Sequence, residues 1–147
     1  MMFHTATPRI ASYVIVRKAN KIAFVLRANT SWMNDYYGLP SGKVEKNESF
    51  SAGAIREALE EIDVMVKLDD LRYVHVMHRH EGTDWVDVYF EVLKWQGTPN
   101  NAEPHMHSEL AWLDPKNLPN NIIPSLKYAL EQIQAGNAYS EYGWQRS

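Results

Sequence analysis

The sequence of 147 residues contains 15 lysine and arginine side chains against 18 aspartate and glutamate side chains, which gives a formal net charge of -3, and it has no cysteine. This length predicts one domain over 1–147, and the lack of cysteine excludes disulfides and thiol catalysis. The chain has no basic surplus for polymeric nucleic acid, no apolar run of membrane-spanning length and no signal-peptide core in its first ten residues, so we expect a cytoplasmic protein with neither nucleic acid nor membrane as a partner.

Two strands, IASYVIVRK and KIAFVLRA, are predicted over 9–27, with a tight turn at 19–21 that asparagine suits. Their apolar runs are nearly continuous, which is typical of strands covered on both faces. Arg27 ends the second strand. A guanidinium at such a position is exposed by default, but it is also suited to bidentate contact with phosphate.

A polar loop with three large aromatic residues, Trp32, Tyr36 and Tyr37, is predicted over 29–37. Each ring can pack in the core or stack on a nucleobase, and we expect one of the three to stack. The next segment, GLPSG over 38–42, is predicted to be a turn that can direct backbone carbonyls toward a bound ion.

A helix is predicted from a cap at Ser49 or Ser51 through Ile62. Three of its glutamates share one face at helical spacing: Glu57, Glu60 and Glu61. The face expected to dock on the core lies nearly opposite and consists of Ile55, Leu59 and Ile62. Like charges on adjacent turns repel, and Mg²⁺ or Mn²⁺, which take several oxygen ligands, would offset that repulsion.

Paired strands are predicted over 71–80 and 85–95, with a turn at 81–84. The strand alternation separates His75 from His78 and His80, and we expect all three at solvated positions. The loop over 97–107 contains His105 and His107, a weak metal pattern without a third ligand nearby. A short strand follows over 109–113.

A second helix is predicted over 123–135, with Pro124 near its first turn and Gly136 after its end. Its apolar residues recur at helical spacing, so it is expected to pack on the core. The tail over 137–147 carries three large aromatic residues and should fold back on the body or on a second subunit. A homodimer is therefore left open.

The stretch over 42–64 has a spaced pattern: Gly42, five residues, Glu48, seven residues, then Arg56, Glu57, Ala58, Leu59, Glu60, Glu61 and finally Val64. This pattern resembles the signature box of the Nudix hydrolases, Gx5Ex7REUxEExGU, in which U is a bulky apolar residue. Asp63 stands where the family has glycine, and Ala58 is small for its apolar position. Aspartate tolerates the left-handed conformation better than most residues, so we expect intact chemistry.

The resemblance implies an α/β fold, the Nudix α/β/α sandwich with a mixed β-sheet and the box helix packed against it. The carboxylates that would bind Mg²⁺ or Mn²⁺ in such a protein are Glu57, Glu60 and Glu61. The carbonyl of Ser41 would join them, and Glu48 with Arg56 would form an ion pair that orients the loop. A further acidic residue from a facing loop is expected at Glu109, with Glu103 as the second choice.

The implied reaction is hydrolysis of a nucleoside diphosphate linked to another group. Residues 80–82 lack the proline or tyrosine that marks members specific for ADP-ribose or diadenosine polyphosphates, which favours a nucleoside triphosphate, intact or damaged, cut to monophosphate and pyrophosphate. Arg27 would then hold phosphate. The alternatives are a pyrophosphatase of a nucleotide sugar or dinucleotide, and a catalytically silent nucleotide-binding module, although such modules usually lose the box carboxylates.

Overall fold

The computed structural model describes residues 4–145, so residues 1–3 and 146–147 of the predicted domain lie outside the described part. The elements in chain order are β1 (Arg9–Lys18), β2 (Lys21–Arg27), β3 (Tyr37–Gly38), β4 (Ser41–Lys43), α1 (Phe50–Ile62), a 3₁₀ helix (Leu68–Asp70), β5 (Leu71–Glu81), β6 (Thr83–Val92), β7 (His107–Leu113), α2 (Pro124–Gln134) and β8 (Tyr139–Tyr142).

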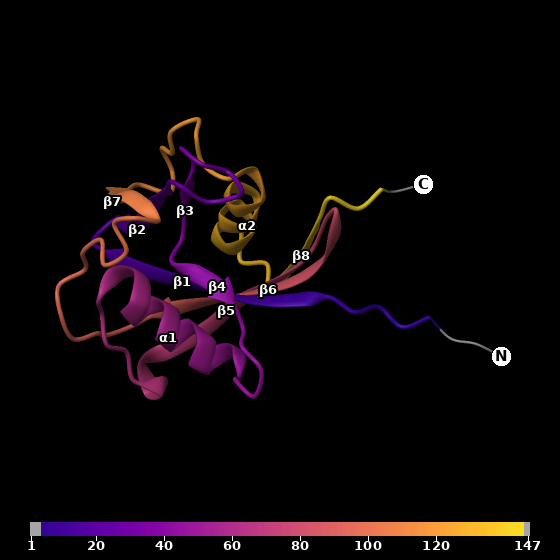
Figure 1. The fold of residues 1–147 in the computed structure, drawn as a ribbon, viewed down its shortest axis with the longest axis horizontal. Helices are drawn as coiled ribbons and strands as arrows, with labels where there is room; N and C mark the ends of the chain where they lie inside the picture. The colour runs from indigo at the N-terminus through magenta and orange to yellow at the C-terminus, as the bar shows by residue number, and fades with distance from the viewer. Residues whose placement is uncertain (1–3, 146–147) are drawn as a thin grey trace.

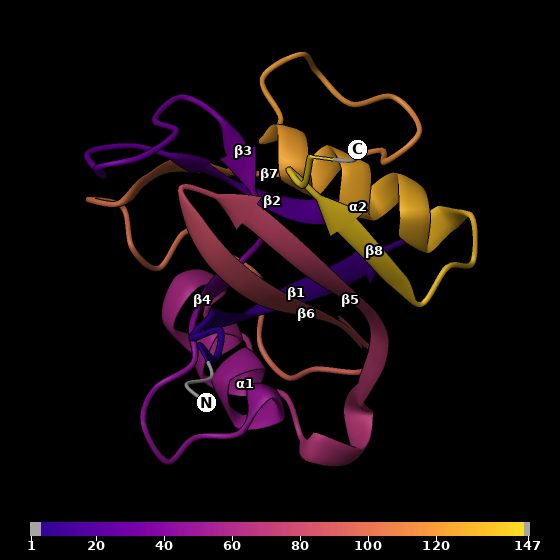
Figure 2. The same ribbon diagram turned by 90° about the vertical axis from the view of Figure 1, so that its right-hand side faces the viewer.

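The strands form one mixed sheet in the order β3-β2-β1-β6-β5-β8, with β4 paired to β1 and β7 paired to β2. The β1–β6 and β5–β8 pairs are parallel, whereas β1–β2 and β5–β6 are antiparallel. Figures 1 and 2 show α1 and α2 on opposite sides of the strands β1, β5 and β6. This arrangement confirms the predicted α/β/α sandwich.

The first two strands turn back on each other as predicted but then diverge. They pair only at Arg17 with Ile22 and at Lys18 with Lys21. Beyond those pairs, β1 runs along β6 and β2 runs along β7. Alternate residues of β1 consequently enter two cores: Val14 packs in the core under α1, and Ile15 packs in the core under α2.

Helix α1 begins after the N-cap Ser49, whose hydroxyl accepts a hydrogen bond from the N–H of Ala52 at 3.0 Å. It ends at Asp63, which has the left-handed conformation (φ 60°, ψ 38°) expected at the position where the family has glycine. Both ends of the helix therefore agree with the prediction.

The predicted core face of α1 is partly wrong. Leu59 is 47% exposed, whereas Ala54, Ala58 and Ile62 are fully buried against the sheet. Small side chains let a helix approach the sheet closely, so the buried face includes residues that carry little hydrophobicity. Because the helix packs through these small residues, two of its glutamates, Glu57 and Glu61, also belong to its buried residues.

The paired strands β5 and β6 are confirmed, with a tighter connection than predicted at Gly82 (φ 74°). His75 is wrong as a solvated residue, because it is fully buried and its ring nitrogens lie 2.7 Å from Asn137 O and from Ser140 Oγ. This buried pairing holds the tail, where β8 adds to the sheet edge beside β5.

Among the described residues, no helix has the length and hydropathy of a membrane-spanning segment.

Candidate active site

The loop before α1 is fastened to the helix at Ser41 and Gly42. The N–H of Ser41 donates to Glu61 Oε2 at 2.7 Å. A methyl group built on Gly42 would overlap Glu57 Oε1, so only glycine leaves room for that carboxylate. These two residues of β4 therefore hold the loop against Glu57 and Glu61, and both carboxylates are buried.

Arg56 makes five hydrogen bonds, three to the loop before α1 and two to carboxylates of α1 itself. Two of them form a bidentate pair with Glu48, from Nε at 2.8 Å and Nη2 at 2.9 Å, so the ion pair implied by the family pattern is present. Nη2 also donates to Lys43 O. Nη1 donates to Glu57 Oε1 at 2.8 Å and to Glu60 Oε2 at 3.1 Å, which fixes the direction of two carboxylates of the predicted metal face.

The loop between β6 and β7 is tied to the C-terminal end of α1. The N–H groups of Asn100 and Ala102 donate to the carbonyls of Ile62 and Glu61 at 3.0 and 3.1 Å. The last carbonyls of a helix have no partner within the helix, and here the loop supplies one. The following turn of the loop consequently lies beside Glu61.

That turn adds two side chains to the carboxylates of α1. Ligand atoms of Glu61, Glu103 and His107 all lie within 4.8 Å of one another. The carbonyl of Glu103 accepts from the N–H of His107 at 2.9 Å, so one turn of backbone places the two side chains together. The prediction gave His107 little weight, although the spacing of four residues between Glu103 and His107 was a usable signal.

Glu109, the first choice for the further acidic residue, lies on β7 opposite Leu26, and its carboxylate accepts a hydrogen bond from the Tyr37 hydroxyl. The Glu109 carboxylate is thus hydrogen-bonded to Tyr37, whereas the Glu103 carboxylate lies in the cluster with Glu61. Tyr36 and Tyr37 are half-buried and pack against the core under α2. Of the three predicted aromatic residues, only Trp32 lines the neighbouring cavity.

This cavity has a volume of about 440 Å³ and lies beside Ser41 and Gly42, between β1, the β5–β6 connection and the start of α2. Its cationic side chains are Arg9, Arg27, Lys43 and Arg79. Three of them surround the ring of Trp85, with Arg79 nearest at 4.8 Å from the ring centre. The sequence did not indicate that Trp85 lines a cavity, because a single tryptophan at the start of a strand forms no recognisable motif.

Arg27 lines the cavity and lies within electrostatic range of Glu61. Its Nε donates to Trp32 O at 2.9 Å and its Nη2 to Thr30 Oγ1, and its guanidinium lies 5.4 Å from the centre of the Trp32 ring. Burial lowers the pKa of Arg27, and the negative charge of Glu61 opposes that change. A fixed cation beside the carboxylates is thus available to a polyphosphate.

The glutamates of the site differ in their electrostatic surroundings. Burial raises the pKa of Glu57 to about 7 against the opposing charge of Arg56, and burial raises the pKa of Glu61 well above its usual range. The bidentate Arg56 instead lowers the pKa of Glu48 to about 2. Burial, with Arg27 and His105 adding to it, lowers the pKa of His107 to about 4, so its imidazole is neutral near pH 7.

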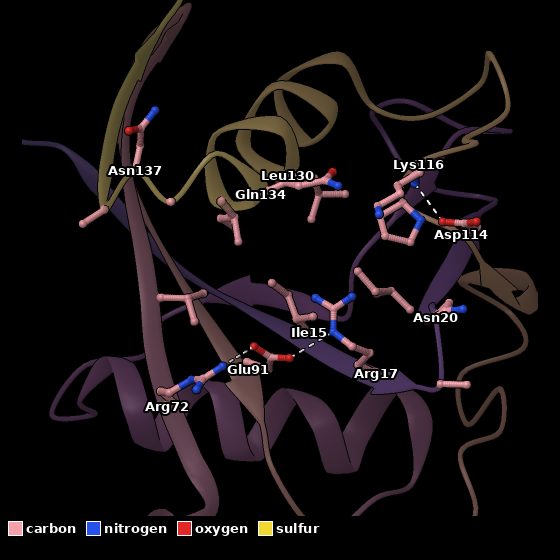
Figure 3. Close-up of a pocket in the computed structure, with 17 residues that line it drawn as sticks. Ile15, Arg17, Asn20, Arg72, Glu91, Asp114, Lys116, Leu130, Gln134 and Asn137 are labelled. Atoms are coloured by element: carbon pink, nitrogen blue, oxygen red, sulfur yellow. Dashed lines mark hydrogen bonds and ion pairs between the residues drawn. The ribbon is translucent and has the colours of Figure 1, made fainter.

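A second cavity of about 620 Å³ lies away from these residues, under the C-terminal end of α2. Figure 3 shows Arg17 and Arg72 on either side of Glu91 at its base, where they donate to the carboxylate at 3.1 and 2.8 Å. Both arginines pair with Glu91. Among residues 4–145, the lining of the larger cavity includes no carboxylate cluster of the kind found at α1, and we place the candidate site at the smaller cavity.

Buried carboxylates with raised pKa values favour a cation that replaces their protons. Mg²⁺ and Mn²⁺, the predicted ions, take oxygen ligands, and Glu61 and Glu103 supply them within 4.8 Å of each other, with the buried Glu57 one turn away on α1. The residues present thus fit a divalent metal ion. Carboxylates that can bind such an ion near a cavity with cationic and aromatic side chains are an arrangement suited to chemistry on phosphates.

The chain belongs to the NUDIX domain family, because the model of that family matches residues 7–133. Members of this family are hydrolases of phosphoric anhydride bonds. The match extends far beyond the box over 42–64, and it includes both helices up to residue 133.

Solved structures agree with this assignment. The crystal structure of a MutT NUDIX hydrolase from Burkholderia pseudomallei is 25% identical with a TM-score of 0.78, over 86% of this chain and 98% of that one. The E. coli ORF135 protein is 24% identical with a TM-score of 0.73, over 88% and 91%. A MutT protein from Methanosarcina mazei Go1 is 16% identical with a TM-score of 0.74, over 90% and 97%. The last two show the fold alone.

Proposed function

We propose that this protein is a metal-dependent pyrophosphohydrolase that cuts a nucleoside triphosphate, intact or damaged, to monophosphate and pyrophosphate. The observation that carries the proposal is the convergence of Glu61 with Glu103, on a helix face that also buries Glu57, near a cavity whose lining includes four cationic side chains. A triphosphate presents its charge to cations and its base to an aromatic ring, and the cavity offers both kinds of side chain.

In this proposal the protein would hold Mg²⁺ or Mn²⁺ through Glu57, Glu60, Glu61 and the carbonyl of Ser41. Glu103 replaces Glu109 as the acidic residue supplied by the loop, because its carboxylate lies near Glu61. When bound, the metal ion neutralises phosphate charge and favours attack by water. Arg56 and Glu48 orient the carboxylates and do not touch the substrate.

Glu57 is the proposed base. Its carboxylate is buried on α1, and burial raises its pKa to about 7 in the metal-free protein. Arg56 donates to one oxygen, Oε1, and so fixes the direction in which the other oxygen can accept a proton from water. Arg27 is proposed to bind phosphate, and the ring of Trp32 is proposed to stack on the base.

Two other substrates would use the same groups. A nucleotide sugar or a dinucleotide would also place its diphosphate at the carboxylates and Arg27, with the second group in the rest of the cavity. A silent nucleotide-binding module would keep the cavity but not the metal face. The ordered contacts of Arg56 to Glu57 and Glu60 favour an enzyme, because binding alone needs no such orientation.

The test is a panel of nucleoside triphosphates, nucleotide sugars and dinucleotides incubated with Mg²⁺ or Mn²⁺, with products identified by phosphorus NMR. The proposal expects monophosphate and pyrophosphate from a triphosphate. Faster cleavage of a sugar or dinucleotide conjugate would transfer the assignment to that substrate class. Binding of nucleotides without any turnover would establish the silent module instead.

A further inference from the structure

His107 differs from an ordinary buried histidine. It is 4% exposed, yet its Nδ1 has no hydrogen-bond partner among residues 4–145, and it is the single buried side-chain atom of that range in this state. Its Nε2 lies 3.5 Å from Glu61 Oε1, which is longer than a good hydrogen bond. Buried polar atoms normally have hydrogen-bond partners. The imidazole of His107 is therefore unusual, because neither of its ring nitrogens makes a good hydrogen bond.

His75 provides the internal comparison. Its ring is equally buried, and both nitrogens lie 2.7 Å from an oxygen atom. Where a buried histidine has only a packing role, as at position 75, both of its ring nitrogens therefore have hydrogen-bond partners. His107 instead lies with two carboxylates, those of Glu61 and Glu103, and the ligand atoms of the three residues are within 4.8 Å of one another, close enough for a small shift to bring them to one ion.

The backbone also holds His107 in this position. Its N–H donates to Glu103 O at 2.9 Å, and its carbonyl accepts from Asn101 Nδ2 at 2.7 Å. The loop that carries Glu103 and leads into β7, whose first residue is His107, is in turn bonded to the carbonyls at the end of α1. The three ligand atoms thus come from two segments whose relative position is fixed, as a preformed site needs.

We propose that His107 supplies a nitrogen ligand to a divalent ion bound at Glu61 and Glu103. The inference rests on the proposed function, because it assigns a ligand within the same metal face. An imidazole suits transition-metal ions more than it suits Mg²⁺, and affinity at mixed nitrogen and oxygen sites rises from Mn²⁺ through Co²⁺. This site therefore binds Co²⁺ or Zn²⁺ more tightly, relative to Mg²⁺, than a site of oxygen ligands alone.

The direct test uses Mn²⁺ alone as the probe, without nucleotide, and pulsed electron paramagnetic resonance as the readout. The wild-type protein should show modulation from a directly bound imidazole nitrogen, and His107→Gln should lose it. His105→Gln is the matched control, because His105 is exposed and lies two residues away, in the loop that leads into β7. It should keep the modulation.

A second readout is the ratio of Co²⁺ to Mg²⁺ affinity, measured by calorimetry on the same proteins. His107→Gln should lower this ratio by about tenfold or more, the order found when a group that supports metal binding is removed. His105→Gln should leave it unchanged.

Wild-type protein without nitrogen modulation would overturn the inference, and so would modulation that persists in His107→Gln. If that variant fails to fold, wild-type protein with nitrogen-15 histidine decides the matter: Zn²⁺ must shift the ring nitrogens of His107 in its NMR spectrum, and unshifted nitrogens would refute the ligand. These readouts need no turnover, so a protein that hydrolyses nucleotides without a nitrogen ligand would contradict this inference and leave the proposed function standing.

Discussion

At the scale of single residues, position 42 tolerates no side chain larger than that of glycine. A methyl group at this position would overlap Glu57 Oε1, so Gly42→Ala must displace the carboxylate. We expect a loss of kcat on the order of 10²-fold, as for removal of one catalytic group, with little change in melting temperature. Steady-state kinetics and thermal unfolding measure both quantities. Adding Gly42→Ala to Glu57→Gln should cost little more, and full additivity would show that the glycine acts elsewhere.

The buried carboxylates provide the second prediction. Glu57→Gln and Glu61→Gln should each lower kcat on the order of 10²- to 10⁴-fold with the fold retained, because each would remove a charged group that acts on metal or water. Glu131→Gln, on the exposed side of α2, is the control. Turnover close to that of the wild-type protein in both variants would refute the assignment of the metal face.

The cavity residues separate base contact from phosphate contact. Trp32→Ala should raise KM with kcat little changed, because stacking is equally strong in ground and transition states. Arg27→Ala should also lower kcat, since phosphate charge is redistributed during the reaction. Tyr36→Ala should lower only the melting temperature, because the ring packs on the core. An unchanged KM in Trp32→Ala would move base recognition to another part of the cavity, for example Trp85.

At this scale, the sequence predicted the residues whose spacing is fixed by one helix. Glu57, Glu60 and Glu61 are found on α1 as expected, and Arg56 meets Glu48. Glu103 and Trp85 could not be ranked in the same way, because their positions depend on how a loop and a strand end meet the helix. A sequence pattern describes neighbouring residues within one helix or strand. Contacts between a loop, a strand end and a helix are determined by tertiary packing.

At the scale of elements, α1 shows why a hydrophobic pattern can misplace a helix face. The helix approaches the sheet through Ala54 and Ala58, which score low for hydrophobicity, while Leu59 remains in solvent. We expect Ala58→Leu to destabilise the fold by about 1 to 3 kcal/mol, because the extra volume overfills a closely packed contact. Leu59→Ala is the matched control and should change the free energy of unfolding by less than about 1 kcal/mol. Equal effects in denaturant unfolding would contradict this packing.

The strands were easier to predict than their partners. Each apolar run over 9–27 became a strand, but β1 found its main partner in β6, more than 70 positions along the chain. Alternation within one strand indicates which residues share a face and carries no information on which strand lies beside it. The α/β/α layout was therefore obtained from the resemblance to the family and not from the periodicity.

At the scale of the whole molecule, the metal face should link stability to pH. Glu57 has a pKa of about 7 in the folded protein against 4.5 in the unfolded chain, so the folded state binds more protons between these values. The contribution of protonated Glu57 to the free energy of unfolding is fully present below pH 4.5 and is lost as the pH rises through about 7. In a chelator, the free energy of unfolding of the wild-type protein minus that of Glu57→Gln should fall over this range. A difference that rises with pH would contradict the raised pKa.

The central claim is hydrolysis of a nucleoside triphosphate between its α- and β-phosphates at the carboxylates of α1. Its most direct test is phosphorus NMR of the reaction in oxygen-18 water with Mg²⁺, comparing wild-type protein with Glu61→Gln. We predict monophosphate and pyrophosphate in equal amounts, with the oxygen-18 label in one of the two, and almost no product from the variant. Release of orthophosphate, or equal turnover by the variant, would contradict the account.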